Sequence, residues 1–222
     1  MRPKNYSARR RPTDCWNARL LEHATYTEVW ELPHFPCANE VPTDFCSFRY
    51  VSPITDDSVW IHFYGADQYL EDVWDNPEIW ANQLTRFKGV ISPDLSIYRD
   101  MPLPQQLYNT YRNRTLAHWF TQQGILVIPN VRWGDQRSYD FAFEGIRKNS
   151  TVCVSTMGIL TDNEDRTEFS RGFDAMMEVL APKTVLVYGS MPLDVFGKHQ
   201  NGNARFIQYE TATRKVHQRG GC

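Results

Sequence analysis

The chain has 222 residues and a mass of 26.0 kDa, which suits one domain of ordinary size. It is short for an eight-unit α/β barrel, which takes about 250 residues. Hydrophobic residues make up 41% and charged residues 23%, which excludes wholesale disorder, and a formal net charge of −2 excludes nucleic-acid binding through bulk charge alone.

Three stretches differ in composition. Residues 1–57 form a region with a basic start, several prolines and isolated aromatic residues. Residues 58–210 alternate between apolar strand-like runs and helical patterns, and we expect one α/β domain there. Residues 211–222 form a basic tail that we expect to be flexible. The first and last eleven residues hold eight of the 24 basic residues and no acid, so the segment between them is acidic.

Strands and helices alternate along the expected domain. Short apolar runs predict six strands, at residues 59–64, 89–91, 125–128, 151–154, 184–188 and 205–209. Apolar residues at helical steps predict helices at residues 67–87 with a break at Asn76-Pro77, at 104–123, at 138–143 with Ser138 as the cap, and at 165–181.

Parallel strands need crossover connections, so this alternation predicts an α/β fold with a mainly parallel sheet of about six strands. The last strand alternates in polarity, which favours a sheet edge. Two arrangements stay open. The sheet can be open and doubly wound, or it can be a small or incomplete α/β barrel to which the N-terminal region adds a strand, for example residues 26–32.

Polar residues follow four successive predicted strands. Ligands of parallel sheets bind beyond the carboxyl ends of the strands, so we expect a site at this rim. Asp94 and Asp135 are the candidate catalytic residues, as general base or nucleophile. Arg132 is suited to clamp a phosphate or carboxylate, and Trp133 offers a stacking plane. The other candidate ligand-binding residues are Arg99, Asp100, Asn130, Ser155, Thr156 and Tyr188.

Each of these residues also has an ordinary structural interpretation. Ser92-Pro93-Asp94 and Trp133-Gly134-Asp135 are common turn sequences, and Arg132 can simply pair with Asp135 or Asp100. The agreement of four successive strand ends favours a binding site, by analogy with other parallel sheets.

The helix predicted from Pro104 mixes aromatic residues with arginines. Such a mixture can line a nucleic-acid groove. However, Tyr108, Tyr111, Thr115 and Trp119 follow helical spacing, which favours a buried stripe.

Five cysteines without a tight spacing favour reduced thiols in a cytosol-like compartment. Cys153 lies in an apolar run and is expected in the core. His34, with Cys15, Cys37 and Cys46 nearby, is the one candidate metal cluster, but only His34 and Cys37 have ligand spacing, so we expect no metal site. We find no signal peptide and no apolar run of membrane-spanning length, and we expect a soluble cytoplasmic protein.

The basic ends carry a separate hypothesis. Arg9, Arg10 and Arg11 can contact the phosphates of a nucleic acid, or they can belong to a solubilising end.

The chain resembles a family of bacterial phages and mobile elements that is known as a domain of unknown function. The resemblance covers about Trp74 to Gly189. It rests on the blocks Phe87–Asp94, Tyr98–Pro102, Tyr108–Arg114, Gly124–Asp135 and Val152–Gly158. It implies a phage or prophage gene product and supplies no catalytic residues.

Three functions are compatible with these observations. The rim predicts binding or processing of a nucleotide, nucleoside or sugar-like ligand, with no cofactor identified. A protein-interaction or counter-defence factor would contact a host component through residues 1–57, and a nucleic-acid-binding protein would use its basic ends.

Overall fold

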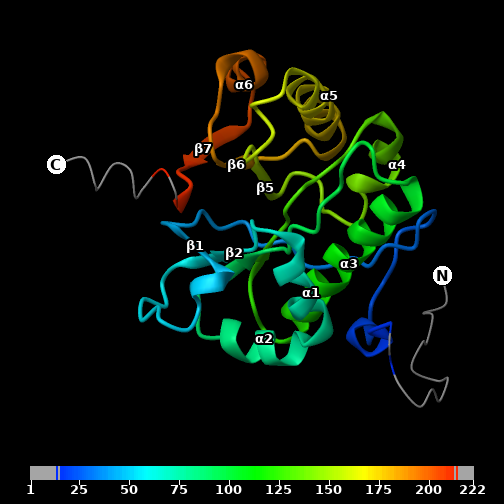
Figure 1. Cartoon of the computed structure of the whole chain (residues 1–222), viewed down its shortest axis with the longest axis vertical. Helices are drawn as coiled ribbons and strands as arrows, with labels where there is room; N and C mark the ends of the chain where they lie inside the picture. Colours follow the sequence, from blue (N-terminus) through cyan, green and yellow to red (C-terminus); the bar gives the residue numbers. More distant parts are fainter. Residues whose placement is uncertain (1–13, 15, 213, 215–222) are drawn as a thin grey trace.

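The structure is a computed structural model, and it describes residues 14, 16–212 and 214 (Figure 1). Its strands are β1 (Phe45–Ser47), β2 (Trp60–His62), β3 (Gly89–Ile91), β4 (Val127–Ile128), β5 (Thr151–Ser155), β6 (Thr184–Tyr188) and β7 (Arg205–Tyr209). Its α-helices are α1 (Asp67–Asp75), α2 (Pro77–Leu84), α3 (Leu103–Gln122), α4 (Tyr139–Ala142), α5 (Asn163–Leu180) and α6 (Leu193–Gln200). Short 3₁₀ turns cover Ala18–Leu21, Phe48–Tyr50 and Gln136–Ser138.

The strands form two parallel sheets, with the orders β1-β2-β3-β4 and β5-β6-β7. A parallel bridge between Asn130 and Cys153 joins the end of the first sheet to the start of the second. Figure 1 shows α1 and α2 beside the first sheet and α5 and α6 beside the second. The predicted α/β fold with parallel strands is therefore confirmed, and β7 lies at an edge as expected.

Both faces of strands β2 to β6 are buried, whereas the edge strands β1 and β7 are partly exposed. One face, which includes Val90, Val127 and Val187, packs into the main core with the helices. The alternate residues gather in a second cluster on the inner face of the curled sheets, and it contains Phe45, Trp60, Tyr64, Ile91, Ile128, Cys153, Leu186, Tyr188 and Tyr209. Burial on two faces explains why these strands read as nearly continuous apolar runs.

The strand order follows the chain order, as in a barrel, yet no ladder joins β7 back to β1 within the described residues. Side chains span the gap instead. The ring of Phe45 on β1 stacks on Tyr209 of β7 with centroids 4.1 Å apart, and the Tyr209 hydroxyl donates to the carbonyl of Pro42 at 2.6 Å. The arrangement is thus curled but not a closed barrel.

The N-terminal region adds a strand to the first sheet, but this strand is not formed by residues 26–32, which were the predicted example. Residues 26–32 do not form a sheet strand, because Tyr26 makes only an isolated antiparallel bridge to Pro33 and the residues between them bend. The N-terminal region contributes β1 instead, and Phe45 pairs in register with Trp60 of β2. A turn that folds back on itself has the same apolar composition as a short strand, which explains the error.

Most helix predictions are confirmed. The break at Asn76 separates α1 from α2, with Pro77 at the first turn of α2. Ser138 does not cap α4, because its hydroxyl donates to the carbonyl of Asp135 at 2.7 Å. Helix α6 was not predicted, since its eight residues carry only a short apolar pattern. No described helix has the length and apolar character needed to cross a membrane.

The buried face of α3 is polar, which contradicts the predicted aromatic stripe. Tyr108 is 44% exposed, and Tyr111 and Trp119 are half-buried, whereas Thr115 is buried as predicted. Besides Leu116, Ala117 and Phe120, which join the main core, the residues that point inward are polar, and they include Gln106, Asn109, Thr110, Arg112, Asn113, Arg114 and His118. Most of these side chains bond to backbone carbonyls of the segments around α3, and Arg112 pairs with Glu71 of α1. The helical spacing of the aromatic residues therefore did not identify the buried face.

Candidate functional site

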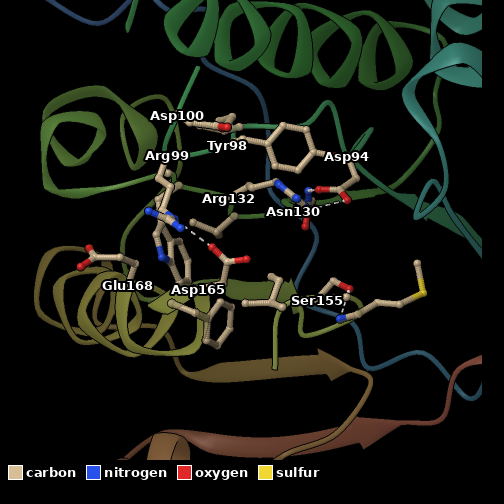
Figure 2. Close-up of a pocket in the computed structure, with 17 residues that line it drawn as sticks. Asp94, Tyr98, Arg99, Asp100, Asn130, Arg132, Ser155, Asp165 and Glu168 are labelled. Atoms are coloured by element: carbon tan, nitrogen blue, oxygen red, sulfur yellow. Dashed lines mark hydrogen bonds and ion pairs between the residues drawn. The ribbon is translucent and has the colours of Figure 1, made fainter. Parts of the chain in front are cut away.

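A cleft of about 510 Å³ opens beyond the carboxyl ends of β3, β4 and β5, where the two sheets meet (Figure 2). The loops after the three strands and the first two turns of α5 form its walls. Its polar lining residues are Asp94, Tyr98, Arg99, Asp100, Asn130, Arg132, Ser155, Asp165 and Glu168. The volume is within the range of small-molecule sites.

One wall of the cleft is built on the carboxylate of Asp94. Its Oδ1 accepts a hydrogen bond from Asn130 Nδ2 at 2.7 Å, and its Oδ2 accepts one from Arg132 Nη1 at 2.9 Å. Burial alone would lower the pKa of Arg132, but the nearby Asp94 carboxylate raises it above its ordinary value. Arg132 therefore stays a guanidinium cation, held in place by a carboxylate whose two oxygens are both engaged.

Behind this wall, a polar chain runs into the inner face of the strands. The hydroxyl of Tyr64 lies 3.1 Å from Asn130 Oδ1 and 3.0 Å from Cys153 Sγ. Burial raises the pKa of Tyr64 well above its usual value and that of Cys153 to about 12. Both groups are therefore neutral near pH 7, and Tyr64 fixes the orientation of the Asn130 amide.

A second set of bonds fixes the ends of β3 and β4. Ser92 Oγ accepts from the backbone N–H of Asn130 at 2.8 Å and from Asn113 Nδ2 at 3.1 Å. Arg114 donates to Asn113 Oδ1 at 2.5 Å and to the carbonyls of Glu144 and Ala142 at 2.8 and 2.7 Å. These bonds connect the cleft wall to the buried polar residues of α3 and hold the ends of β3 and β4 in place.

The opposite wall is formed by α5, from which Asp165 and Glu168 project (Figure 2). Asp165 Oδ1 accepts from Arg99 Nε at 2.9 Å, and Glu168 pairs with Arg171 at 2.6 Å. Asp100 is exposed. Of the four cleft carboxylates, it alone forms no ion pair in the part of the chain that the structure describes.

The apolar part of the cleft is packed around Trp133, which is only 7% exposed. Its ring lies 5.1 Å from Phe169 and 6.0 Å from Phe143, measured between centroids. A Cβ at Gly172 of α5 would overlap the indole ring. Trp133 thus lines the cleft and belongs to the main core.

Seven of the ten predicted site residues line the cleft, and they are Asp94, Arg99, Asp100, Asn130, Arg132, Trp133 and Ser155. The other three lie elsewhere. Asp135 pairs with Arg137, whose hydrogen bond lowers the pKa of the carboxyl. The Thr156 hydroxyl donates to the carbonyl of Ser190 at 2.8 Å, and Tyr188 packs in the inner cluster.

Sequence reasoning missed Asp165 and Glu168. A signal was present for Asp165, which lies four residues before Phe169 and so on the same face of α5, and Glu168 follows Asp165 by three residues. An acid beside an apolar stripe lies at the border of the buried face, as the 45% exposed side chain of Asp165 shows, where it can meet a basic partner or a ligand.

Several predictions concern residues outside the site. Among the described residues, no group of three or more His, Cys, Asp and Glu side chains is placed to hold a metal ion. His34 is exposed, whereas Cys37 is buried. Cys15 and the basic residues Arg9, Arg10 and Arg11 lie outside the residues that the structure describes.

Comparison with known proteins supports the predicted resemblance. A family described as Domain of unknown function (DUF4417) matches residues 24–210. Two curated relatives are the Gene 1 proteins of Mycobacterium phage D29 and Mycobacterium phage L5. Each is 33% identical over 131 residues, which are 59% of this chain, 48% of the D29 protein and 57% of the L5 protein. The chain therefore spans about half the length of these relatives. No solved structure matches the chain.

Proposed function

The chain belongs to the DUF4417 family, and from the cleft of this family member we propose that the protein binds a small phosphorylated ligand of nucleotide or sugar type. Its relatives are phage proteins, and their names state no ligand. The proposal therefore depends on the side chains of the cleft.

The observation that carries the proposal is the state of Arg132. A guanidinium has five N–H donors, and Asp94 accepts from one nitrogen of Arg132 at 2.9 Å. Within the described part of the chain Arg132 donates no other hydrogen bond, and its side chain is 20% exposed toward the cleft. A charged guanidinium with spare donors and a fixed position is suited to bind a phosphate with two parallel hydrogen bonds.

The rest of the ligand would occupy the space between the two walls. Tyr98 is 50% exposed, and its ring centroid lies 5.8 Å from Arg132 Cζ, so the ring can cover a sugar or a base next to the phosphate. Carboxylates accept hydrogen bonds from hydroxyl groups, and Asp100 has no ion-pair partner among the described residues to compete for it. These groups favour a phosphate attached to a hydroxyl-bearing ring over phosphate alone.

If the protein also transforms its ligand, the cleft favours Asp100 over Asp94 as the proton acceptor. Both oxygens of Asp94 accept hydrogen bonds, so Asp94 is a positioning residue for Arg132 in this proposal. Asp135 lies outside the cleft and takes no part in it.

Isothermal titration calorimetry with four probes tests the proposal. The probes are adenosine 5′-monophosphate, ribose 5-phosphate, adenosine and inorganic phosphate. We expect the two phosphorylated sugars to bind more tightly than adenosine or inorganic phosphate. Arg132→Gln should weaken their binding by about tenfold or more, because it removes a charge-assisted bidentate interaction with the phosphate.

The matched control is Arg137→Gln, which breaks an arginine–aspartate pair on the same rim but outside the cleft. Its binding should equal that of the wild type. The proposal is wrong if none of the phosphorylated probes binds, or if Arg132→Gln and Arg137→Gln bind them equally well.

A further inference from the structure

A second cavity, of about 470 Å³, lies at the amino ends of β5 and β6, which is the sheet edge opposite to the cleft. Three basic side chains line it, those of Arg147, Lys148 and Lys183. We call it the basic pocket. Its other walls are polar and include Asn39 and Thr151.

The charges of this pocket are not neutralised. No carboxylate lines it, and none of Arg147, Lys148 and Lys183 forms an ion pair with any residue that the structure describes. Most other arginines of the described chain do pair with acids, as Arg19, Arg99, Arg112, Arg132, Arg137 and Arg166 show. Arg205, which is in register with Thr184, is exposed and adds a fourth positive charge at the same edge.

Hydrogen bonds tie the backbone around the basic pocket to neighbouring segments. Asn149 has a φ of 58°, and its N–H donates to the carbonyl of Leu180 at 2.9 Å. The N–H of Lys183 donates to the carbonyl of Ser150 at 3.0 Å, and Thr151 Oγ1 donates to the carbonyl of Asn39 at 3.2 Å. The basic side chains therefore extend from a loop and a strand start whose backbone is tied to neighbouring segments by hydrogen bonds.

We propose that the basic pocket is a phosphate-binding site that is separate from the cleft. All the residues that line this concave surface are polar or charged, and three of them are cations that form no ion pair with the described residues, although Arg147 also donates to the carbonyl of Cys37 at 3.4 Å. Such a surface, with no acid in its lining, matches a phosphate, whose oxygens accept several charge-assisted hydrogen bonds. The phosphate can belong to a free polyphosphate compound or to a nucleic-acid backbone, and titration with one probe of each kind separates these two sources.

The experiment compares the full-length chain with the variant Lys148→Gln/Lys183→Gln, which removes two charges and keeps most of each side chain. Tripolyphosphate is titrated by calorimetry, and a fluorescein-labelled single-stranded oligonucleotide is titrated by fluorescence anisotropy. We expect binding at the pocket to weaken by about tenfold or more in the variant. For the oligonucleotide, the slope of log K against log salt should shrink by about 0.7 for each phosphate that the variant no longer binds.

Two controls define the result. Arg19→Gln/Lys198→Gln changes the net charge by the same amount at exposed positions outside the pocket, and it should bind both probes within about twofold of the wild type. Arg132→Gln tests the cleft and should leave the pocket intact, so failure of the cleft proposal and failure of this one are distinguishable.

Loss of oligonucleotide binding in the pocket variant, with or without loss of tripolyphosphate, would assign the phosphate to a nucleic-acid backbone, and loss of tripolyphosphate alone would assign it to a free compound. Either result supports the site. The proposal is overturned if the pocket variant binds both probes as well as the control variant does, or if neither probe binds the wild type.

Discussion

Arg132 Nη1 donates a hydrogen bond of 2.9 Å to Asp94 Oδ2, and this ion pair links the loop after β3 to the loop after β4. The side chain of Asp94 is 8% exposed and that of Arg132 is 20% exposed. A pair with so little solvent contact stabilises the wall only while both partners are present, since either charge alone would be buried without its counterion. The same pair fixes the direction of the guanidinium toward the cleft.

We expect Asp94→Asn to lower the free energy of unfolding by about 2 to 3 kcal/mol, because the amide loses the charge and has one acceptor oxygen for two donors, Asn130 Nδ2 and Arg132 Nη1. Urea denaturation followed by circular dichroism measures this change. The partial exposure of Arg132 places the expected loss below the range of about 3 to 5 kcal/mol for fully buried pairs.

The double variant Asp94→Asn/Arg132→Gln is the control for that experiment. It removes both charges and allows the two amides to bond, so it should recover part of the lost stability. A double variant whose loss equals the sum of the two single losses would show that the pair is not energetically coupled.

Gly172→Ala should displace Trp133, because the new Cβ would overlap the indole ring. We expect a loss of about 1 to 3 kcal/mol from overpacking and a change in tryptophan fluorescence. Gly197→Ala on α6 is the matched control. A Cβ there meets its nearest neighbour at 3.7 Å, so we expect equal or slightly higher stability. Equal effects of the two substitutions would contradict the packing described for Trp133.

Stability should decline in alkaline solution. Burial raises the pKa of Cys153 from 9.0 to about 12 and that of Tyr209 from 10.0 to about 12. The unfolded chain therefore loses these protons first as the pH rises, and the stabilisation that is complete below about pH 9 is lost toward pH 12. Urea unfolding at about pH 8 and about pH 10.5 measures the decline.

Cys153→Ala removes one of these groups and should make the alkaline decline less steep, whereas Cys46→Ala controls for the loss of a thiol elsewhere. An unchanged slope in Cys153→Ala would mean that this thiol ionises alike in the folded and unfolded chains.

Asp100→Asn should separate the two parts of the proposed ligand. We expect weaker binding of ribose 5-phosphate, by about threefold to tenfold, because the variant lacks the charged acceptor for a hydrogen bond from a sugar hydroxyl. Binding of inorganic phosphate should not change. Calorimetry measures both, and equal weakening of the two probes would argue against an interaction between Asp100 and the sugar hydroxyls.

The sequence predicted the parallel α/β fold and one wall of the cleft. Asp94, Asn130 and Arg132 directly follow buried strands, and the carboxyl ends of adjacent parallel strands meet at one edge. This simple rule brought together residues that are 38 positions apart in the chain.

Position after a strand was not sufficient for other residues. Tyr188 ends β6, but its side chain lies on the same face of the strand as that of Leu186, two residues earlier. It therefore packs in the second cluster, on the inner face of the sheets. Asp135 accepts a bond of 3.0 Å from the N–H of Arg137, which is local turn capping. The α5 wall depends on how that helix packs against the sheets, and strand patterns contain no information on that packing.

The most direct test of the central claim is a crystal structure of the protein with adenosine 5′-monophosphate. We predict phosphate density within hydrogen-bond distance, about 2.7 to 2.9 Å, of a guanidinium nitrogen of Arg132 that Asp94 does not bind. Asp94 should keep its bond to the other side of the guanidinium. Nucleotide density that lies only in the basic pocket, or in the cleft with its phosphate away from Arg132, would contradict the proposed function.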